Sequence, residues 1–245
     1  MRRDRAGRRG AELFLLGRAF EDCLERIALI ERRFERALLL GCPDPSWPDR
    51  VPATHVDVVD PGPQFAASAG GTTIIEDAWA PDATAYDLIL AVGTLDTVNN
   101  LPLALRILRA ATRPDGLLIG AMSGGDTLPQ LRAAMRAADG VIGAAAPHVH
   151  PRIEPSMVAP LLDNAGFAKA VIDVDRVQVS YPNLGSLVAD LRAMGATNIL
   201  AERARHAVGK SARAAADQAF ITAGNGDRTV ETFEIIHFAA WASAE

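Results

Sequence analysis

Five short apolar runs, spaced along the first half of the chain, constrain the fold more than any other feature of this sequence. They cover residues 37–40, 55–60, 72–75, 86–92 and 117–122, and a glycine, a proline or an acidic residue follows each of the first four. Parallel strands are buried on both faces, so they appear in a sequence as nearly continuous apolar runs. The pattern predicts an α/β fold with a parallel sheet that is covered by helices on both faces.

Helical periodicity fills several of the segments between and after these runs. In residues 11–35, Leu16, Phe20 and Leu24 recur at helical spacing, while charged residues occupy the other face. Pro102 is compatible with a helix over residues 101–111, because proline is tolerated in the first turn. Further helices are expected at residues 128–138, 157–165 and 184–194, and Gly195 ends the last of these. Alanine-rich and arginine-rich helix is expected after it, to about residue 220.

Two strands are expected to complete the sheet. Residues 170–181 alternate between apolar and polar side chains, which is typical of a long strand, and residues 230–241 form a last apolar strand. The sequence therefore predicts a seven-stranded, mostly parallel sheet with the last strand antiparallel. We expect a single domain over residues 11–245, with helical insertions forming a cap at about 128–168 and 184–220. Residues 1–10 are expected to form a basic, partly disordered arm.

Composition narrows the class of protein. With 49% hydrophobic residues in 245, the chain can bury a large core. A formal net charge of −5 disfavours nucleic acid as a partner, and no apolar run approaches the roughly 20 residues of a membrane span. The two cysteines, Cys23 and Cys42, have no zinc-binding spacing and are expected to be reduced thiols of a cytoplasmic protein.

The carboxyl ends of the predicted strands indicate where a ligand would bind. In open α/β sheets, ligands bind in the crevice outside these ends. The residues found there are Gly41, Asp60, Asp77 and Gly93. We expect these four residues to converge on one cleft.

Several strings of residues resemble one branch of the class I S-adenosylmethionine-dependent methyltransferases. That branch contains the mitochondrial complex I assembly factors that hydroxylate an arginine, together with their bacterial relatives, and the methyltransferases of biotin synthesis lie near it. The Gly-Gly-Asp-Thr-Leu and Asp-Leu-x-x-Met-Gly-x-x-Asn strings are specific when found together. The matching strings occupy residues 95–102, 113–116, 124–128, 147–151, 173–182 and 190–198.

The resemblance implies a Rossmann-like fold and a set of positions for S-adenosylmethionine. Asp60 would accept hydrogen bonds from the ribose hydroxyls, and Asp77 with Ala78 would read the adenine amino group. Gly93 would border the same cleft. In such enzymes a glycine-rich loop after the first strand faces the methionine carboxylate, and here only Gly41 of that loop remains.

Two prolines make the cofactor loop degenerate. Pro43 and Pro45 replace glycines of the pattern, and Leu39 replaces its acidic residue. Proline has no N–H and cannot adopt positive φ. Losing two hydrogen bonds to a charged group costs about 3–6 kcal/mol, or on the order of 10²–10⁴ in affinity. The sequence therefore predicts weak binding of S-adenosylmethionine, or none.

Catalytic residues are not defined by any motif, and three weak candidates stand out. Asp126 precedes a predicted helix, which it would otherwise cap. His148 belongs to a His-x-His pair with His150 and is a candidate for substrate contact or proton transfer. Tyr181 would shape the pocket, and packing explains it equally well. No metal site is expected, because a third ligand beside the two histidines is not evident.

Three functions are compatible with these observations. The first is an S-adenosylmethionine-dependent methyltransferase acting on a small molecule or a protein. The second, implied by the resemblance, is an arginine hydroxylase or assembly factor that acts on a subunit of respiratory complex I. The third is a non-catalytic binding protein that kept the fold and lost the cofactor. Fold by itself does not decide among them.

Overall fold

The computed structural model describes residues 2–7, 13–203 and 208–243. One seven-stranded sheet runs through it in the order β3-β2-β1-β4-β5-β7-β6. Strands β3 to β5 are parallel, and β7 is antiparallel to both of its neighbours, β5 and β6. The predicted sheet is confirmed. Its strands are β1 Phe34–Leu40, β2 Ala53–Asp60, β3 Thr72–Thr73, β4 Tyr86–Val92, β5 Thr112–Ser123, β6 Phe167–Tyr181 and β7 Thr229–Ala242.

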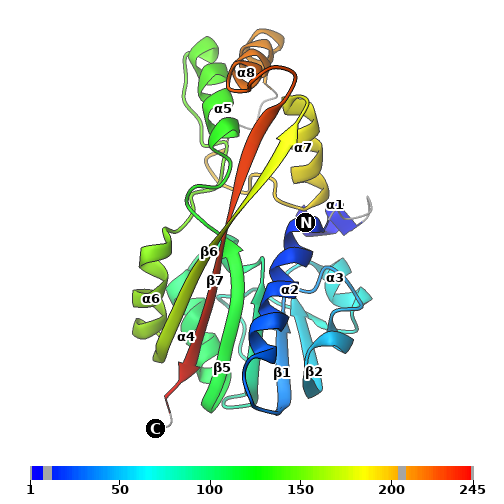
Figure 1. The fold of residues 1–245 in the computed structure, drawn as a ribbon, viewed down its shortest axis with the longest axis vertical. Helices are drawn as coiled ribbons and strands as arrows, with labels where there is room; N and C mark the ends of the chain where they lie inside the picture. The colour runs from blue at the N-terminus through cyan, green and yellow to red at the C-terminus, as the bar shows by residue number, and fades with distance from the viewer. Residues whose placement is uncertain (1, 8–12, 204–207, 244–245) are drawn as a thin grey trace.

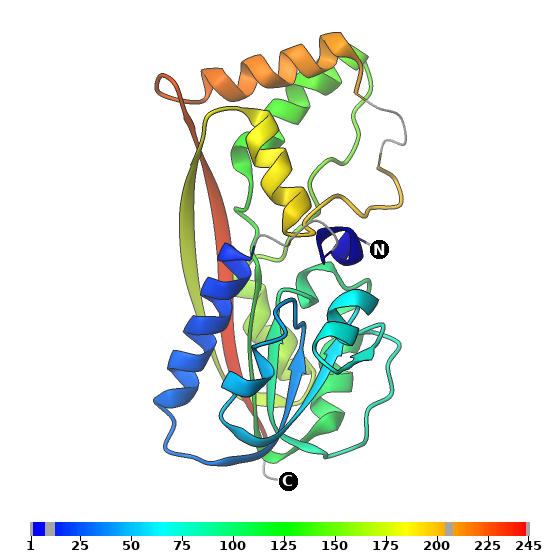
Figure 2. The same cartoon turned by 90° about the vertical axis from the view of Figure 1, so that its right-hand side faces the viewer.

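Helices cover both faces of the sheet, as Figures 1 and 2 show. On one face α2 packs its apolar side, with Phe20 and Cys23, against buried residues of β1, β4 and β5. On the other face α4 and α6 pack against the same strands and against β7. The helices are α1 Arg2–Gly7, α2 Phe14–Ala28, α3 Pro63–Ser68, α4 Leu101–Ala111, α5 Pro129–Ile142, α6 Pro155–Asn164, α7 Leu184–Ala193 and α8 Lys210–Thr222, with short 3-10 helices η1 Pro48–Arg50 and η2 Leu95–Thr97.

A separate helical cap lies beyond the carboxyl ends of the strands. Figure 1 shows α5, α7 and α8 around the far ends of β6 and β7, which are long enough to leave the sheet and enter the cap. The cap has its own core, in which Phe220 of α8 and Tyr181 and Phe233 of the two strands are buried together. The expected inserted helical cap is therefore present, and β6 and β7 connect it to the sheet.

The expected bounds of the insertions differ from those observed. Residues 128–168 do not all belong to the cap, because α6 packs on the sheet: Val158 and Leu162 are buried with β5 and β7. In the second expected insertion, α7 ends at Ala193, close to the predicted stop at Gly195, and the helix that follows it, α8, begins only at Lys210. Periodicity identified these helices, but it could not say which apolar layer each would join.

The amino-terminal segment also departs from expectation. Residues 2–7, expected to belong to a partly disordered arm, form α1, and Arg3 is buried. The helix expected over 11–35 ends at Ala28, because Phe34 begins β1. Residues 8–12, which include the start of that expected helix, lie outside the described residues.

Strand ends were predicted less well than strand interiors. The expected strand at 72–75 is reduced to Thr72–Thr73. The Pro-Asp-Gly string at 114–116, expected as a turn before the fifth strand, lies within β5, where the register against β4 shifts. Asp115 has a φ of 57° there, so the residues that predicted a turn instead make an irregularity in a longer strand.

A network of charged side chains joins α2 to the antiparallel strands. Arg18 donates to Asp175 at 2.5 Å, and Arg26 donates to Asp173 at 2.7 Å and to Asp22 at 2.5 Å. Asp173 and Asp175 of β6 therefore hold α2 against this strand. These pairs are partly exposed, so each contributes at most about 1 kcal/mol.

His237 of β7 is buried beneath this network and gives a pH-dependence to test. Its Nδ1 lies 2.9 Å from the Asp22 carboxylate, and burial lowers its pKa below the ordinary value of 6.5 despite Asp22. A group whose pKa is lowered on folding stabilises the native state above its unfolded pKa, and this contribution is lost as pH falls. Between pH 7.5 and 5.5 the free energy of unfolding should fall, and His237→Phe should show a smaller fall in urea denaturation. An equal fall in both proteins would contradict this.

Candidate functional site

Three of the four predicted cleft residues do meet at the carboxyl edge of the sheet. Gly41 has a φ of 91°, and a Cβ there would lie 2.3 Å from the Val92 carbonyl oxygen, so only glycine fits. The N–H of the next residue, Cys42, donates to the Asp60 carboxylate at 2.8 Å. Gly93 lies beside them. Gly41, Asp60 and Gly93 therefore lie together, but of the three only Gly93 borders the cavity described below, and their role in a cofactor cleft stays a prediction.

Asp60 is fully buried, and donors of this chain surround its carboxylate. Arg3 donates to it through Nε at 2.9 Å and through Nη2 at 2.5 Å. The N–H groups of Cys42 and Gly62 donate at 2.8 Å and 2.6 Å. In this state both carboxylate oxygens are engaged, and Asp60 offers no exposed acceptor to a ribose.

Helix α1 brings Arg3 to this position. The Arg3 guanidinium also donates to the Gly93 carbonyl at 3.2 Å and lies 5.2 Å from the centre of the Phe65 ring. Asp4 accepts from the N–H of Gln64 at the start of α3, at 3.2 Å. Figure 2 shows α1 between the edge of the sheet and the cap. The side chain of Arg3 therefore occupies the place where the resemblance puts the ribose of the cofactor.

N–H groups of the loop after β1 already donate to acceptors within this chain. Gly41 donates to the Val59 carbonyl at 2.9 Å, and Cys42 donates to Asp60. Further along, the N–H groups of Ser46 and Trp47 donate to the side chain and the carbonyl of Asp44. Pro43 and Pro45 have no N–H to give. These groups therefore form no cradle for a carboxylate.

Asp77 and Ala78 lie away from this group. The Asp77 carboxylate accepts from the N–H of Asn100 at 2.8 Å, just before α4. Ala78 is exposed, and neither residue lines the cavity described next. Asp77 thus fixes a loop, and its expected contact with adenine stays a prediction.

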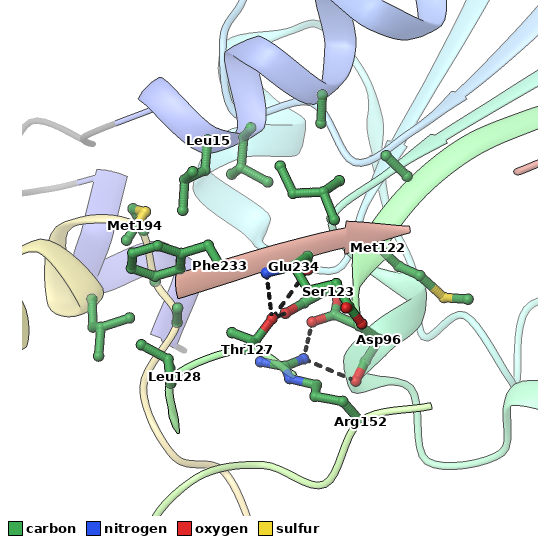
Figure 3. A pocket seen from close by; sticks show the side chains of 18 of the residues that line it. Leu15, Asp96, Met122, Ser123, Thr127, Leu128, Arg152, Met194, Phe233 and Glu234 are labelled. Atoms are coloured by element: carbon green, nitrogen blue, oxygen red, sulfur yellow. Dashed lines mark hydrogen bonds and ion pairs between the residues drawn. The ribbon is translucent and has the colours of Figure 1, made fainter. Parts of the chain in front are cut away.

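A mainly apolar cavity, here called the junction cavity, opens beside Gly93 between the sheet and the cap. Leu15 and Leu16 of α2 border it on one side, and Met194, just after α7, borders it on another. The ends of β5 and β7 form its floor through Met122 and Phe233. Figure 3 shows Leu15, Met194 and Phe233 grouped on one side of this space. A cavity with apolar walls and a few polar groups is the usual form of a small-molecule site.

Two sets of polar residues border the junction cavity. Asp96, in η2 directly after β4, forms an ion pair with Arg152, and the two side chains are 9% and 6% exposed. Thr127 Oγ1 donates to the Glu234 carbonyl and accepts from the Glu234 N–H, both at 3.0 Å, and it accepts from Ser123 at 3.1 Å. The buried Glu234 carboxylate in turn accepts from an arginine of β6 at 3.0 Å. Figure 3 shows both sets close together.

Asp126 does not line the junction cavity, although its N–H donates to the Glu234 carboxylate at 3.5 Å. Its side chain is 70% exposed and lies 3.6 Å from Arg176. It also does not cap α5, which the sequence suggested as its structural explanation. The Glu231 carboxylate of β7 does so instead, accepting from the N–H of Leu131 at 2.8 Å and of Gln130 at 3.3 Å.

His148 and Tyr181 both belong to the cap. His148 Nε2 lies 2.7 Å from the Asp139 carboxylate of α5, and the ring borders a second cavity inside the cap. Tyr181 is buried in the cap core, where burial and nearby Asp190 raise its pKa. It lines neither cavity. His150 interacts with the Pro151 carbonyl, and among the described residues no group of three potential ligands is placed to hold a metal ion.

Sequence reasoning missed the charged residues that border the junction cavity. Asp96 and Arg152 lie within or directly beside two of the matched strings, so those strings were a usable signal. No sequence signal pointed to Arg3 or Glu234, because their partners lie 57 and 107 positions away in the sequence.

Comparisons with known proteins agree with the fold. No family model matches the chain. The arginine-hydroxylase NDUFAF5 of Danio rerio is 36% identical over 158 residues, which are 64% of this chain and 49% of that protein. The malonyl-[acyl-carrier protein] O-methyltransferase of Xylella fastidiosa (strain M23) is 36% identical over 157 residues, 64% of this chain and 52% of that protein. The chain has the class I methyltransferase fold, and about two thirds of it is similar in sequence to these two proteins.

A solved structure extends the likeness over nearly the whole chain. Phosphoethanolamine N-methyltransferase 2 of Haemonchus contortus, in complex with phosphomonomethylethanolamine and S-adenosylhomocysteine, superposes with a TM-score of 0.53. The match covers 91% of this chain and 52% of that one, at 11% sequence identity, so it shows the methyltransferase fold and nothing more. The chain spans about half the length of the curated relatives it matches.

Proposed function

We propose that this chain is a binding protein of the methyltransferase fold that works without S-adenosylmethionine. The observation that carries the proposal is the buried ion pair between Arg3 and Asp60. A ribose would have to displace Arg3 from Asp60, and the displaced guanidinium would then lose its buried partner. The glycine loop offers no compensating donors, because Pro43 and Pro45 lack them.

The function of such a protein follows from what it retains. The fold, the cap and the junction cavity are present, and a cavity of this type can hold a ligand without catalysis. The arginine-hydroxylase NDUFAF5 is a curated relative, so an assembly function on a respiratory-complex subunit is the biological setting we favour. The two free, buried cysteines support a cytoplasmic protein.

A second candidate is transfer catalysis with S-adenosylmethionine. It is favoured by the malonyl-[acyl-carrier protein] O-methyltransferase relative and by the junction cavity, which begins beside Gly93. Methyl transfer depends mainly on aligning donor and acceptor in a dry site. It would require α1 to leave Asp60, which makes the position of α1 the feature that separates the two candidates.

Calorimetric titration of the full chain decides between them. S-Adenosylmethionine and S-adenosylhomocysteine are expected to bind no more tightly than a Kd of about 100 µM, because Arg3 holds Asp60 and the loop supplies no free donors. Thermal unfolding with and without each compound serves as a second readout, since a ligand of the native state raises the midpoint. A Kd in the low micromolar range would instead establish the second candidate.

A further inference from the structure

The second cavity, here called the cap cavity, has a charge that the composition of the chain does not suggest. Arg152, Arg192 and His148 are among the residues that line it, and the described lining residues include no carboxylate. The chain as a whole has a net charge of −5. Positively charged side chains therefore cluster at one cavity of a protein that is acidic overall. Such a cluster raises the local concentration of anions.

Arg152 has hydrogen-bonding capacity that the chain leaves unused. Its side chain is only 6% exposed, and its Nη1 is held by the carboxylate and the carbonyl of Asp96. Its Nε is buried and has no hydrogen-bond partner among the described residues. Figure 3 shows the other terminal nitrogen turned away from Asp96, towards Thr127 and Leu128. A buried donor without a partner is costly, and a bound ligand is one way to satisfy it.

The surroundings of Arg152 add positive charge. Arg132 of α5 has its pKa lowered by burial and by the nearby charges of Arg152 and Arg136. Asp96 is the carboxylate paired with Arg152, while Asp139 is held by His148. Cations crowded in this way, with their neighbouring acids already engaged, are stabilised when an anion enters.

We propose that the cap cavity binds an oxyanion, a carboxylate or a phosphate, carried on an apolar chain, and that Arg152 anchors it. The Nε and Nη2 of a guanidinium form a fork that matches two oxygens of either group, and in Arg152 the Nε of this fork has no partner among the described residues. Asp96 orients this fork by holding Nη1. This bidentate geometry is specific to arginine, and lysine cannot reproduce it.

The walls of the cavity explain the apolar part of the ligand. Leu131, Met135 and Val149 line the cap cavity together with Leu128 and Leu191. Leu128, Arg152, Leu191 and Ala196 also line the junction cavity, so the two cavities adjoin at Arg152. An acyl or alkyl chain held at its charged end by Arg152 would extend along these apolar side chains, which favour its removal from water.

The inference deepens the proposed binding function by naming its ligand class, yet its test is separate. Titration of the full chain with decanoate and with decyl phosphate measures the cap cavity and involves no S-adenosylmethionine. Failure of the cofactor prediction leaves this test unaffected, and the reverse also holds. At least one probe is expected to bind, and the comparison of the two identifies carboxylate or phosphate as the preferred head group.

Matched probes and variants make the test decisive. Decyltrimethylammonium has the chain with the opposite charge and is expected not to bind, as are acetate and inorganic phosphate, which lack the chain. In Arg152→Leu/Asp96→Leu both charges are removed, so no buried charge is left unpaired, and affinity should fall at least about 10-fold. Arg106→Ala, an exposed arginine on α4, should bind like the unmodified chain, and thermal unfolding should show that both variants fold.

Three outcomes would overturn the proposal. The first is no binding of either probe by the folded, unmodified chain. The second is equal binding of the cationic and anionic probes, which would indicate an apolar site without charge recognition. The third is unchanged affinity in the folded Arg152→Leu/Asp96→Leu variant, which would place the ligand elsewhere.

Discussion

Replacing Pro43 and Pro45 by glycine, together with Arg3 by alanine, is expected to raise the affinity for S-adenosylmethionine by about 10²–10⁴. The glycines restore two backbone donors and permit positive φ, and the loss of Arg3 frees the Asp60 carboxylate from its ion pair. Isothermal titration calorimetry of the variant and the unmodified chain measures the change. Circular dichroism should show the same sheet content in both, because the apolar strands are untouched.

Two controls isolate the contributions of the loop and of Arg3. Pro52→Gly removes an exposed proline beyond the loop and should leave affinity unchanged, although it lowers stability slightly through the unfolded state. The single variant Arg3→Ala removes only the ion pair with Asp60, and it should give only part of the gain in affinity for S-adenosylmethionine. If the triple variant folds and its affinity does not rise, neither the prolines nor Arg3 limits cofactor binding.

Asp60→Ala is expected to lower the free energy of unfolding by about 3–5 kcal/mol, because it strands a buried arginine. Arg3 is 6% exposed, and the N–H groups of Cys42 and Gly62 lose their acceptor as well. Urea denaturation followed by circular dichroism measures the loss. Asp57→Ala, in the same strand, removes a pair with Arg36 whose side chains are 42% and 38% exposed, and it should cost below about 1 kcal/mol.

The double variant Arg3→Leu/Asp60→Leu separates the cost of a stranded charge from the value of the pair. Replacing both members of a buried pair by apolar residues is often neutral or stabilising. The double variant should therefore be clearly more stable than Asp60→Ala. Equal destabilisation by Asp60→Ala and Asp57→Ala would mean that Arg3 is not buried against Asp60 in solution.

The sequence by itself determined the sheet. The strand at Tyr86–Val92 and the helix at Leu101–Ala111 were predicted to the residue. The strand is a continuous apolar run that ends at a glycine, and the helix begins with a proline in its first turn, so local signals mark both ends. The degenerate loop was equally readable, because proline lacks an N–H in any fold.

Local signals failed where neighbours in space compete with neighbours in sequence. Asp126 had the residue type and position of a helix cap, but Glu231 from a distant strand supplies the cap of α5. The helix at Pro155–Asn164 had the pattern of an amphipathic helix, which does not specify the layer that it covers. A sequence pattern predicts which face of a helix or strand a side chain lies on, but it does not predict which residue that side chain contacts.

Only the tertiary structure decided the state of the candidate site. Asp60 was placed correctly at the end of its strand, yet the group that meets it is Arg3 of a helix that no periodicity indicated. Arg152 and Asp96 become a pair because the segment before α6 and the segment after β4 lie near the same edge of the sheet. The interaction between two charges depends on the distance between them in space. In both pairs that distance is a few ångströms, although the residues lie more than fifty positions apart in the sequence. The spacing of residues in the sequence therefore does not predict such pairs.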